Sequence, residues 1–338
     1  MKKFKIFTIL PAFTAVFIVS IIGAQACGEV KDVVTKSFDA QDGGLLKIES
    51  DRGSIDIKTH LKDEVIIQVI RYADVSDDAE AQKIFNEFSL EFSQDENTVS
   101  VRGKVDENML GIFNNSNKLK VKYEATIPEK FDVDLNTAGG SIVIGDLDGK
   151  VEARTAGGSL NFGRIDGPVL GKTAGGSIRL ESSEEDVDLK TAGGSIAVGP
   201  IEGDAQLETS GGSIRVGEVE GTLVAYTAGG SISIEGVAGS VDAKTSGGSV
   251  RAAIREQPKN ECRLKTSAGN IGISLPEHIS LNIKAQTFGG KVTTDLPITV
   301  KGDISKSQIQ GTLNGGGPLL LLETSGGNIT ISKGKEML

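Results

Sequence analysis

A six-residue motif, TAGGSI or a close variant of it, occurs seven times at intervals of 18 residues. Its copies begin at Thr137, Thr155, Thr173, Thr191, Thr209, Thr227 and Thr245. A fixed period is typical of repeat proteins, in which each repeat is a small unit that becomes stable only by stacking on its neighbours. The chain is therefore expected to fold as a coil, although 338 residues could otherwise hold two globular domains.

Apolar residues alternate with polar ones on both sides of each motif. In the first copy, Val133 and Leu135 precede the threonine, and Ile142 and Ile144 follow the glycines. Apolar residues two positions apart indicate a strand with one buried face. Two short strands and two turns therefore form one rung, and we predict an all-β parallel β-solenoid (β-helix) with 18-residue rungs. Its strands should lie about 4.8 Å apart. Because crossovers between parallel strands are overwhelmingly right-handed, we expect a right-handed coil.

The paired glycines of each motif are interpreted as corners between the two strands of a rung. A tight corner requires either a positive φ or a close approach of two backbones, and glycine permits both. These structural repeat corners are predicted at Gly139, Gly140, Gly157, Gly158, Gly175, Gly176, Gly193, Gly194, Gly211, Gly212, Gly229, Gly230, Gly247 and Gly248. If the φ of Gly193 is positive, Gly193→Val should destabilise the coil by about 1–3 kcal/mol.

The threonine of each motif has the parity of the buried strand residues, so we expect it to point inward or into the corner. An ice-binding solenoid needs outward-facing threonine pairs on a flat sheet. The inward parity therefore disfavours ice binding.

The positions between the apolar residues carry charged side chains and are expected to face the solvent. Acidic residues stand three places before the threonine at Asp134, Glu152, Asp188 and Asp242, and basic residues stand one place before it at Arg154, Lys172, Lys190 and Lys244. Two such columns side by side offset the repulsion between stacked like charges. On the strand that follows the glycines, Arg179, Arg215 and Arg251 occupy alternate rungs, which keeps them apart. This arrangement favours a solvated face over a ligand site.

The repeat loosens after the seventh copy but continues. Further copies begin at Thr266 and Thr287, each 21 residues after the one before, and a last copy begins at Thr324 after a longer interval. Cys262 falls on a core position of this series. We therefore assign residues 131–333 to the β-solenoid repeat domain and expect the coil to reach almost to the C-terminus.

Residues 27–130 are predicted to form an N-terminal cap with degenerate repeats and one short helix. The stretch LLKIESDRGSIDIK resembles a degenerate rung, with Gly53, Ser54 and Ile55 standing where Gly-Ser-Ile stands in later copies. A helix is expected from Asp77 to about Phe88, because Asp77 followed by Glu80 makes a capping-box-like start and the apolar residues then share one face. An open terminal rung is a template for edge pairing, so this segment is a natural cap. A separate binding head is the alternative.

Residues 1–26 have the features of an export signal: a basic start, an apolar run and small residues before Cys27. Ala24-Gln25-Ala26 fits ordinary signal-peptide cleavage, and Cys27 fits the lipidated cysteine of a lipoprotein, although Gln25 matches that second pattern poorly. Lipidated Cys27 with a free, buried Cys262 is the more economical interpretation, and a disulfide between them is the alternative. We expect an exported protein of the bacterial cell envelope, lipid-anchored at Cys27 or otherwise periplasmic or secreted.

The charge and the side-chain inventory disfavour several classes of function. Cleavage after Ala26 removes three lysines and no acidic residue, so the net charge changes from −10 to −13, which repels nucleic acid. His60 and His278 have no partner at metal-ligand spacing, there is no P-loop, and the glycine turns lack the aspartates of calcium-binding solenoids. We therefore predict no catalytic, cofactor-binding or metal-binding residue.

The motifs as a set are similar to a known family. The repeated TAGGSI, the lead-in KYEATIPEKFDVDLNTAGGSI and the closing GTLNGGGPLLLLETSGGNITISK resemble the bacterial putative adhesins with β-strand repeats, a domain of unknown function. The likeness covers roughly residues 35–333. It implies a β-solenoid on an exported or surface-anchored protein, and it brings no catalytic residue and no defined ligand.

The expected function is therefore that of a non-enzymatic, envelope-anchored β-solenoid acting as an adhesin or surface scaffold. Its expected partners are a membrane, through the lipid anchor, and a protein or glycan on a surface. The alternative is a carbohydrate-binding or carbohydrate-active β-helix protein, for which carboxylates gathered in a groove and turnover of a glycan would be evidence.

Overall fold

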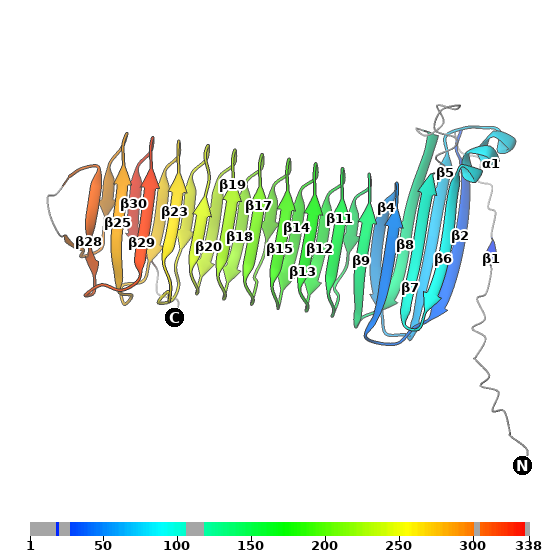
Figure 1. Ribbon diagram of the computed structural model, residues 1–338, viewed down its shortest axis with the longest axis horizontal. Coiled ribbons are helices and arrows are strands. Elements are labelled where there is room, and N and C mark those ends of the chain that lie inside the picture. The colour runs from blue at the N-terminus through cyan, green and yellow to red at the C-terminus, as the bar shows by residue number, and fades with distance from the viewer. Residues whose placement is uncertain (1–17, 20–27, 106–117, 301–304, 335–338) are drawn as a thin grey trace, which may run out of the picture.

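The computed structural model describes residues 18–19, 28–105, 118–300 and 305–334. They form two 15-stranded sheets and one helix, and the strands follow one another along the longest axis of the molecule (Figure 1). Sheet A contains β4 and the even strands β10–β24, and sheet B contains β3 and the odd strands β9–β23. The all-β prediction is confirmed, with parallel pairing through most of both sheets.

The N-terminal region contains β1 (Ile18–Val19), β2 (Val30–Asp39), β3 (Gly44–Ser50), β4 (Ser54–His60), β5 (Glu64–Ala73), α1 (Asp78–Asn86), β6 (Phe88–Asp95), β7 (Thr98–Val105) and β8 (Leu119–Pro128). The regular rungs contain β9 (Phe131–Thr137), β10 (Ile142–Ile144), β11 (Val151–Thr155), β12 (Leu160–Ile165), β13 (Val169–Thr173), β14 (Ile178–Ser183), β15 (Val187–Thr191), β16 (Ile196–Val198), β17 (Ala205–Thr209), β18 (Ile214–Val219), β19 (Leu223–Thr227), β20 (Ile232–Val237), β21 (Val241–Lys244) and β22 (Val250–Ala253). The C-terminal region contains β23 (Cys262–Thr266), β24 (Ile271–Leu275), β25 (Leu281–Thr287), β26 (Val292–Thr294), β27 (Thr299–Val300), β28 (Gln308–Leu313), β29 (Leu319–Thr324) and β30 (Ile329–Lys333).

From β9 to β21 in sheet B and from β10 to β22 in sheet A, paired residues of neighbouring strands are 18 positions apart in the sequence. Ile142 pairs with Leu160 in sheet A, and Thr155 pairs with Thr173 in sheet B. The alternating apolar residues of both sheets point into the space between them and form one continuous buried core. The core therefore consists of stacked columns of similar side chains. The right-handed sense of the coil stays a prediction.

The motif threonines lie inside the coil, as the parity of the sequence predicted. All ten, from Thr137 to Thr324, are at most 7% exposed. In the second copy, the Thr155 hydroxyl donates a hydrogen bond to the carbonyl oxygen of Gly140 in the preceding rung, at 2.8 Å, and accepts one from the Gly158 N–H at 3.3 Å. The motif threonines from Thr155 to Thr266 each link their own corner to the corner of the preceding rung in the same way, so these hydroxyls are used inside the coil.

The second glycine of each corner is required for close backbone approach, and neither glycine of the pair is required for a positive φ. Among the described residues, positive φ is found at five glycines, none of them a corner glycine of the seven regular copies. A Cβ placed on the second glycine of each pair would lie only 2.0–2.2 Å from a backbone carbonyl oxygen of the neighbouring rung. On Gly194 it would lie 2.1 Å from the Gly176 oxygen, whereas on Gly193 it would lie 3.2 Å from the Gly175 oxygen. The premise for Gly193→Val was therefore wrong, and Gly194 is the constrained position.

At the N-terminal end, parallel stacking gives way to antiparallel pairing. β3 and β4 stack on β9 and β10 as a further rung, with Ile55 beside Ile142. Beyond them, β8, β5, β2 and β1 extend sheet A, and β7 and β6 extend sheet B, through mainly antiparallel ladders. β1 lies within residues 1–26, whose assignment as an export signal stays a prediction. The choice between a cap and a binding head for residues 27–130 also stays open.

The helix begins where the sequence predicted. Asp77 is the N-cap of α1, and its side chain accepts a hydrogen bond from the Glu80 N–H at 2.9 Å. Arg71 of β5 joins this helix to the sheet, because its guanidinium pairs with Asp32 at 2.5 Å and donates to the Phe85 carbonyl oxygen at 3.0 Å. The helix ends before Phe88 because Phe88 already belongs to β6.

At the C-terminal end, the rungs do not stack in chain order. The last copy of the motif, in β29 and β30, lies between the rung of β23 and β24 and the rung of β25 and β26 (Figure 1). Cys262 pairs with Leu320, and Leu320 also pairs with Ile283. The antiparallel strands β28 and β27 then extend sheet B beyond β25. The last copy of the motif therefore belongs to the coil, but it forms an inner rung.

Within the described residues, the structure contains no helix with the length and apolar character that a membrane span needs.

Candidate functional site

The outer face of sheet B is the candidate functional surface. Three shallow grooves lie on it, with volumes of about 500, 460 and 660 Å³. The first spans β3, β6, β7, β9 and β11, the second spans β13, β15, β17 and β19, and the third extends from β17 to β29. Many of their outward side chains come from the two columns that stand three places and one place before each motif threonine, and Asp186 and Asp204 in the second groove stand five places before it.

The first groove gathers carboxylates and arginines. Glu49, Glu91 and Asp134 line it together with Arg102 and Arg154. Glu49 pairs with Arg102 at 3.1 Å, and Arg154 lies 3.7 Å from Asp134 and also pairs with Glu152 of its own strand. Exposed pairs of this kind contribute little to stability. They do show that the acidic and basic columns offset each other both within a strand and between rungs.

The second groove is lined by side chains that help to stack the rungs. Asp186 accepts a hydrogen bond from the Asp204 N–H at 2.8 Å, and Asp204 accepts one from the Thr222 N–H at 2.7 Å. Leu170 and Val224 contribute the apolar outward part of this groove. The carboxylates of Asp186 and Asp204 are thus already used by the backbone of the next rung, whereas that of Asp188 lies 3.4 Å from Lys190 Nζ.

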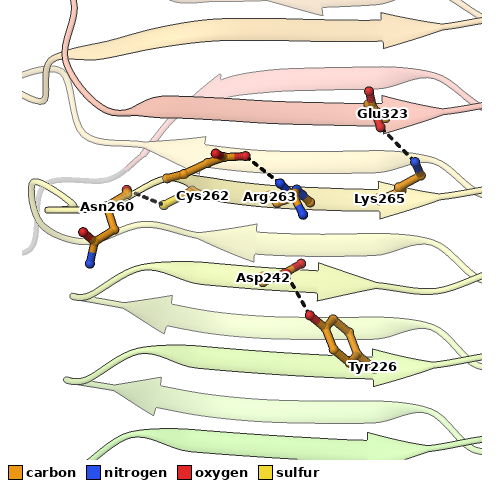
Figure 2. A network of polar contacts seen from close by, with 8 residues as sticks. Tyr226, Asp242, Asn260, Cys262, Arg263, Lys265 and Glu323 are labelled. Carbon is orange, nitrogen blue, oxygen red and sulfur yellow. Dashed lines mark hydrogen bonds and ion pairs between the residues drawn. The ribbon is translucent and has the colours of Figure 1, made fainter.

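The third groove contains an aromatic residue, Tyr226, on the outward face of β19. Its hydroxyl donates a hydrogen bond to Oδ2 of Asp242 on the neighbouring strand β21, at 2.8 Å (Figure 2). Burial of the hydroxyl and this bond to a carboxylate raise the pKa of Tyr226 to about 12. The side chain therefore reaches across to the neighbouring strand while it lines the groove.

The charges around Tyr226 balance. Glu208, Asp242 and Glu323 line the groove together with Lys244, Arg263 and Lys265. Lys265 pairs with Glu323 at 3.0 Å, and Arg263 pairs with Glu261 at 2.9 Å (Figure 2). The other oxygen of Asp242, Oδ1, is buried and has no hydrogen-bond partner among the described residues. The groove therefore combines an apolar ring face with hydrogen-bonding groups of both signs.

None of the predicted corner glycines lines these grooves. They lie in the bends between the two strands of a rung, and Cys27 lies outside the described residues. Cys262 is a free cysteine in the core, and burial raises the pKa of its thiol. His60 Nε2 lies 2.8 Å from the Glu64 carbonyl oxygen at the end of β4. No group of three potential metal ligands occurs in the described part of the chain.

Sequence reasoning missed Tyr226. In the column one place before the threonine, the regular copies carry Asn136, Arg154, Lys172, Lys190, Glu208, Tyr226 and Lys244. Tyr226 is the aromatic exception in this column, and Val224 two places earlier is uncharged, as are Leu170 and Gln206 at the same position of other copies. Among the sheet B strands from β9 to β23, β19 is the one whose outward residues carry no charge. A comparison of outward columns, rung by rung, could have found this departure.

None of the curated proteins matches this chain in sequence. Among solved structures, it is similar to a "putative cell adhesion protein" from Clostridium sporogenes, at 12% identity over 90% of this chain and 99% of that chain, with a TM-score of 0.23. It is also similar to a "putative adhesin" from Bacteroides fragilis, at 12% identity over 89% and 97% of the two chains, with a TM-score of 0.36. A "putative lipid binding protein" from Parabacteroides distasonis shares 12% identity over 90% and 97%, with a TM-score of 0.35.

The family match covers the degenerate rung, the regular rungs and the last copy of the motif. The model of one family, Toastrack DUF4097, matches residues 46–332. That span is most of the 338-residue chain, and the protein therefore belongs to the Toastrack DUF4097 family.

Proposed function

We propose that this protein is an exported, envelope-anchored and non-enzymatic solenoid that acts as an adhesin or surface scaffold. In this proposal the coil is right-handed with 18-residue rungs, and sheet B presents the binding surface. The anchor is a lipid on Cys27, and the partner is a protein or a glycan on a neighbouring surface.

One observation carries the proposal, namely the division of labour between the inside and the outside of each rung. Thr191 donates to the Gly176 carbonyl oxygen and accepts from the Gly194 N–H, so these motif residues are used by stacking. The outward positions three places and one place before the threonine differ from rung to rung. Fixed buried residues with variable outward ones are what a rigid display surface requires.

Adhesion is tested on cells that carry the protein. Cells with the wild-type chain should attach to a partner surface more strongly than cells lacking it, and soluble mature protein should compete with that attachment. As a matched control, the Cys27→Ser chain should be exported without remaining at the cell surface. Equal attachment with and without the protein would contradict the proposed function.

The lipid anchor has its own test. Intact mass and detergent partitioning of the membrane fraction should show an acylated N-terminal cysteine in the wild type and none in Cys27→Ser. An unmodified chain that partitions into the aqueous phase would contradict the anchor and would leave a secreted protein.

A second candidate is a carbohydrate-active solenoid, favoured by the carboxylates of the first groove. Glu49, Glu91 and Asp134 lie there beside Arg102 and Arg154. Release of reducing ends or unsaturated products from a polysaccharide, abolished in Glu91→Gln, would establish this activity. Polysaccharides left intact by the wild type under saturating protein would exclude it.

A further inference from the structure

We infer that the Tyr226 groove is a subsite for a neutral pyranose of a polysaccharide. This inference rests on the proposed adhesin function, for which it names the class of ligand and the place of binding. The groove is defined by Glu208, Tyr226, Asp242, Lys244 and their neighbours on β23 and β29.

Tyr226 supplies an aromatic ring that lines the groove. Tyr226 is half-buried, and its hydroxyl is held by Asp242 at 2.8 Å, so the ring has a fixed orientation along the sheet. Val224 lies two residues earlier on the same outward face of β19. Together they form an uncharged stripe within a charged surface. Rigid aromatic rings give large contact area at little entropic cost, and a pyranose has an apolar face that fits such a ring.

Polar groups that are able to bind a sugar stand on both sides of the Tyr226 ring. Glu208 pairs with Tyr226 on one side, and Lys244 pairs with it on the other. Neighbouring strands lie about 4.8 Å apart, so an acceptor and a donor stand about 10 Å from each other with the ring between them. No ion pair engages Glu208 or Lys244 within the described residues. Sugar hydroxyls both donate and accept hydrogen bonds, so one ring can use both groups.

The charges that line the groove balance, and this balance disfavours charged ligands. Three acidic and three basic side chains line the groove, so neither an anion nor a cation gains net attraction. Nucleic acid, which could also stack on a tyrosine, is repelled by a chain with a net charge of −10. A neutral saccharide is the ligand class that needs both signs at once.

The experiment measures binding of the mature chain to named neutral saccharides: laminarin, dextran, a neutral galactan and an N-acetylglucosamine hexamer. At least one should bind, and Tyr226→Ala should weaken that binding at least tenfold, as for an aromatic residue at the centre of an interface. Tyr226→Phe keeps the ring and should stay within about threefold of the wild type. Lys172→Ala, at the same column position three rungs away, should bind as the wild type does.

A second readout separates binding from folding. The chain has no tryptophan and three tyrosines, of which Tyr123 is fully buried, so a change of tyrosine emission on contact with a ligand comes from Tyr72 or Tyr226. Saccharide should change the emission of the wild type, and Tyr226→Phe should bind without that change. Equal melting temperatures would show that the variants are folded.

The outcomes distinguish this inference from the proposed function. Binding by none of the four saccharides, or binding unaffected by Tyr226→Ala, would overturn the subsite. Cell attachment that persists in Tyr226→Ala would then leave the adhesin standing with another ligand. If cells lacking this protein fail to attach, and the purified chain binds a saccharide through Tyr226, both the adhesin function and the subsite are supported.

Discussion

The regular rungs and the C-terminal rungs use the same corner but stack in different orders. In the regular region the Thr191 hydroxyl donates to the Gly176 carbonyl oxygen, from the copy directly before it in the chain. In the C-terminal region, Thr324 donates to Gly269 and Thr287 donates to Gly327, so the last copy stands between two earlier ones. All three hydrogen bonds are 2.7–2.8 Å long.

Rungs therefore recognise each other through backbone groups. A carbonyl oxygen is the same in every copy, so the corner of any rung can stack on the corner of any other. The order of rungs must then be set by the connecting segments. Between Thr287 and Thr324 the chain forms β26, β27 and β28 before it returns, which allows the last copy to enter between its predecessors.

The largest effect is expected from removing the inserted rung. Truncation after Gly317 deletes β29 and β30 and with them Leu320, Leu322, Ile329 and Ile331, all fully buried. Burial of four such side chains stabilises by roughly 6 kcal/mol or more. Hydrogen exchange should lose protection from β23 onward while β9–β17 stay protected, because rungs contact only their neighbours. Truncation after Gly334 is the control and should change nothing. Unaltered protection of β25 in the shorter chain would contradict the inserted order.

The N-terminal end replaces the threonine corner with a different buried contact. Ser50 occupies the threonine column beside Thr137, and its Oγ lies 2.8 Å from the hydroxyl of the fully buried Tyr123. Burial raises the pKa of Tyr123 to about 12, above the value near 10 in the unfolded chain.

This contact predicts a loss of stability at high pH. The folded state holds the tyrosine proton more tightly, so the free energy of unfolding should fall as the pH rises from 10 to 12, by an amount on the order of 3 kcal/mol at most. Tyr123→Phe removes the titrating group, and its pH dependence should be flatter by that amount in chemical denaturation. Parallel pH curves for the two proteins would exclude the contribution of Tyr123.

A smaller effect is expected from a single corner hydroxyl. Thr191→Val leaves the Gly176 carbonyl oxygen and the Gly194 N–H without the threonine hydroxyl. Such a loss at a buried site costs about 1–3 kcal/mol. Thr191→Ser keeps the hydroxyl and should lose less than half of that in urea denaturation. If the two variants lost equal stability, packing of the methyl group would explain the effect better than the hydrogen bonds.

The smallest effect is expected on the outer face of sheet A. Arg179 points outward from β14 and is exposed, so Arg179→Ser should change the free energy of unfolding by no more than about 0.5 kcal/mol. Thermal unfolding beside the wild type measures this. A loss well above 1 kcal/mol would mean that the outward columns also hold the coil together.

The sequence predicts those parts of the fold that depend on side chains in a fixed pattern. The buried threonines follow from their parity with Val133 and Leu135, and α1 follows from the cap at Asp77. The order of the last rungs leaves no such pattern in the sequence. The hydroxyls of Thr324 and Thr287 donate to backbone carbonyl oxygens, which every copy of the motif has. The antiparallel pairing at the N-terminal end could not be predicted either, because apolar and polar residues alternate in β5 and β8 as they do in any half-buried strand.

The candidate site was harder to predict than the fold. Its position follows from a departure in one column, where Tyr226 replaces a charged or amide residue, and a single departure is a weak signal in sequence. The structure adds the contact with Asp242 and the groove that continues to Leu321 and Glu323, which lie almost one hundred residues further along the chain. That neighbourhood exists only because the last rung is inserted beside β23.

The central claim is that the second glycine of each corner is fixed by close contact between rungs. Thermal and urea unfolding of Gly194→Ala beside Gly193→Ala tests it most directly, because the two variants add the same methyl group at adjacent positions. The added Cβ would lie 2.1 Å from the Gly176 oxygen in the first and 3.2 Å from the Gly175 oxygen in the second. We predict a loss of about 3 kcal/mol for Gly194→Ala and less than about 1 kcal/mol for Gly193→Ala. Equal losses, or a larger loss at Gly193, would contradict this account of how the rungs stack.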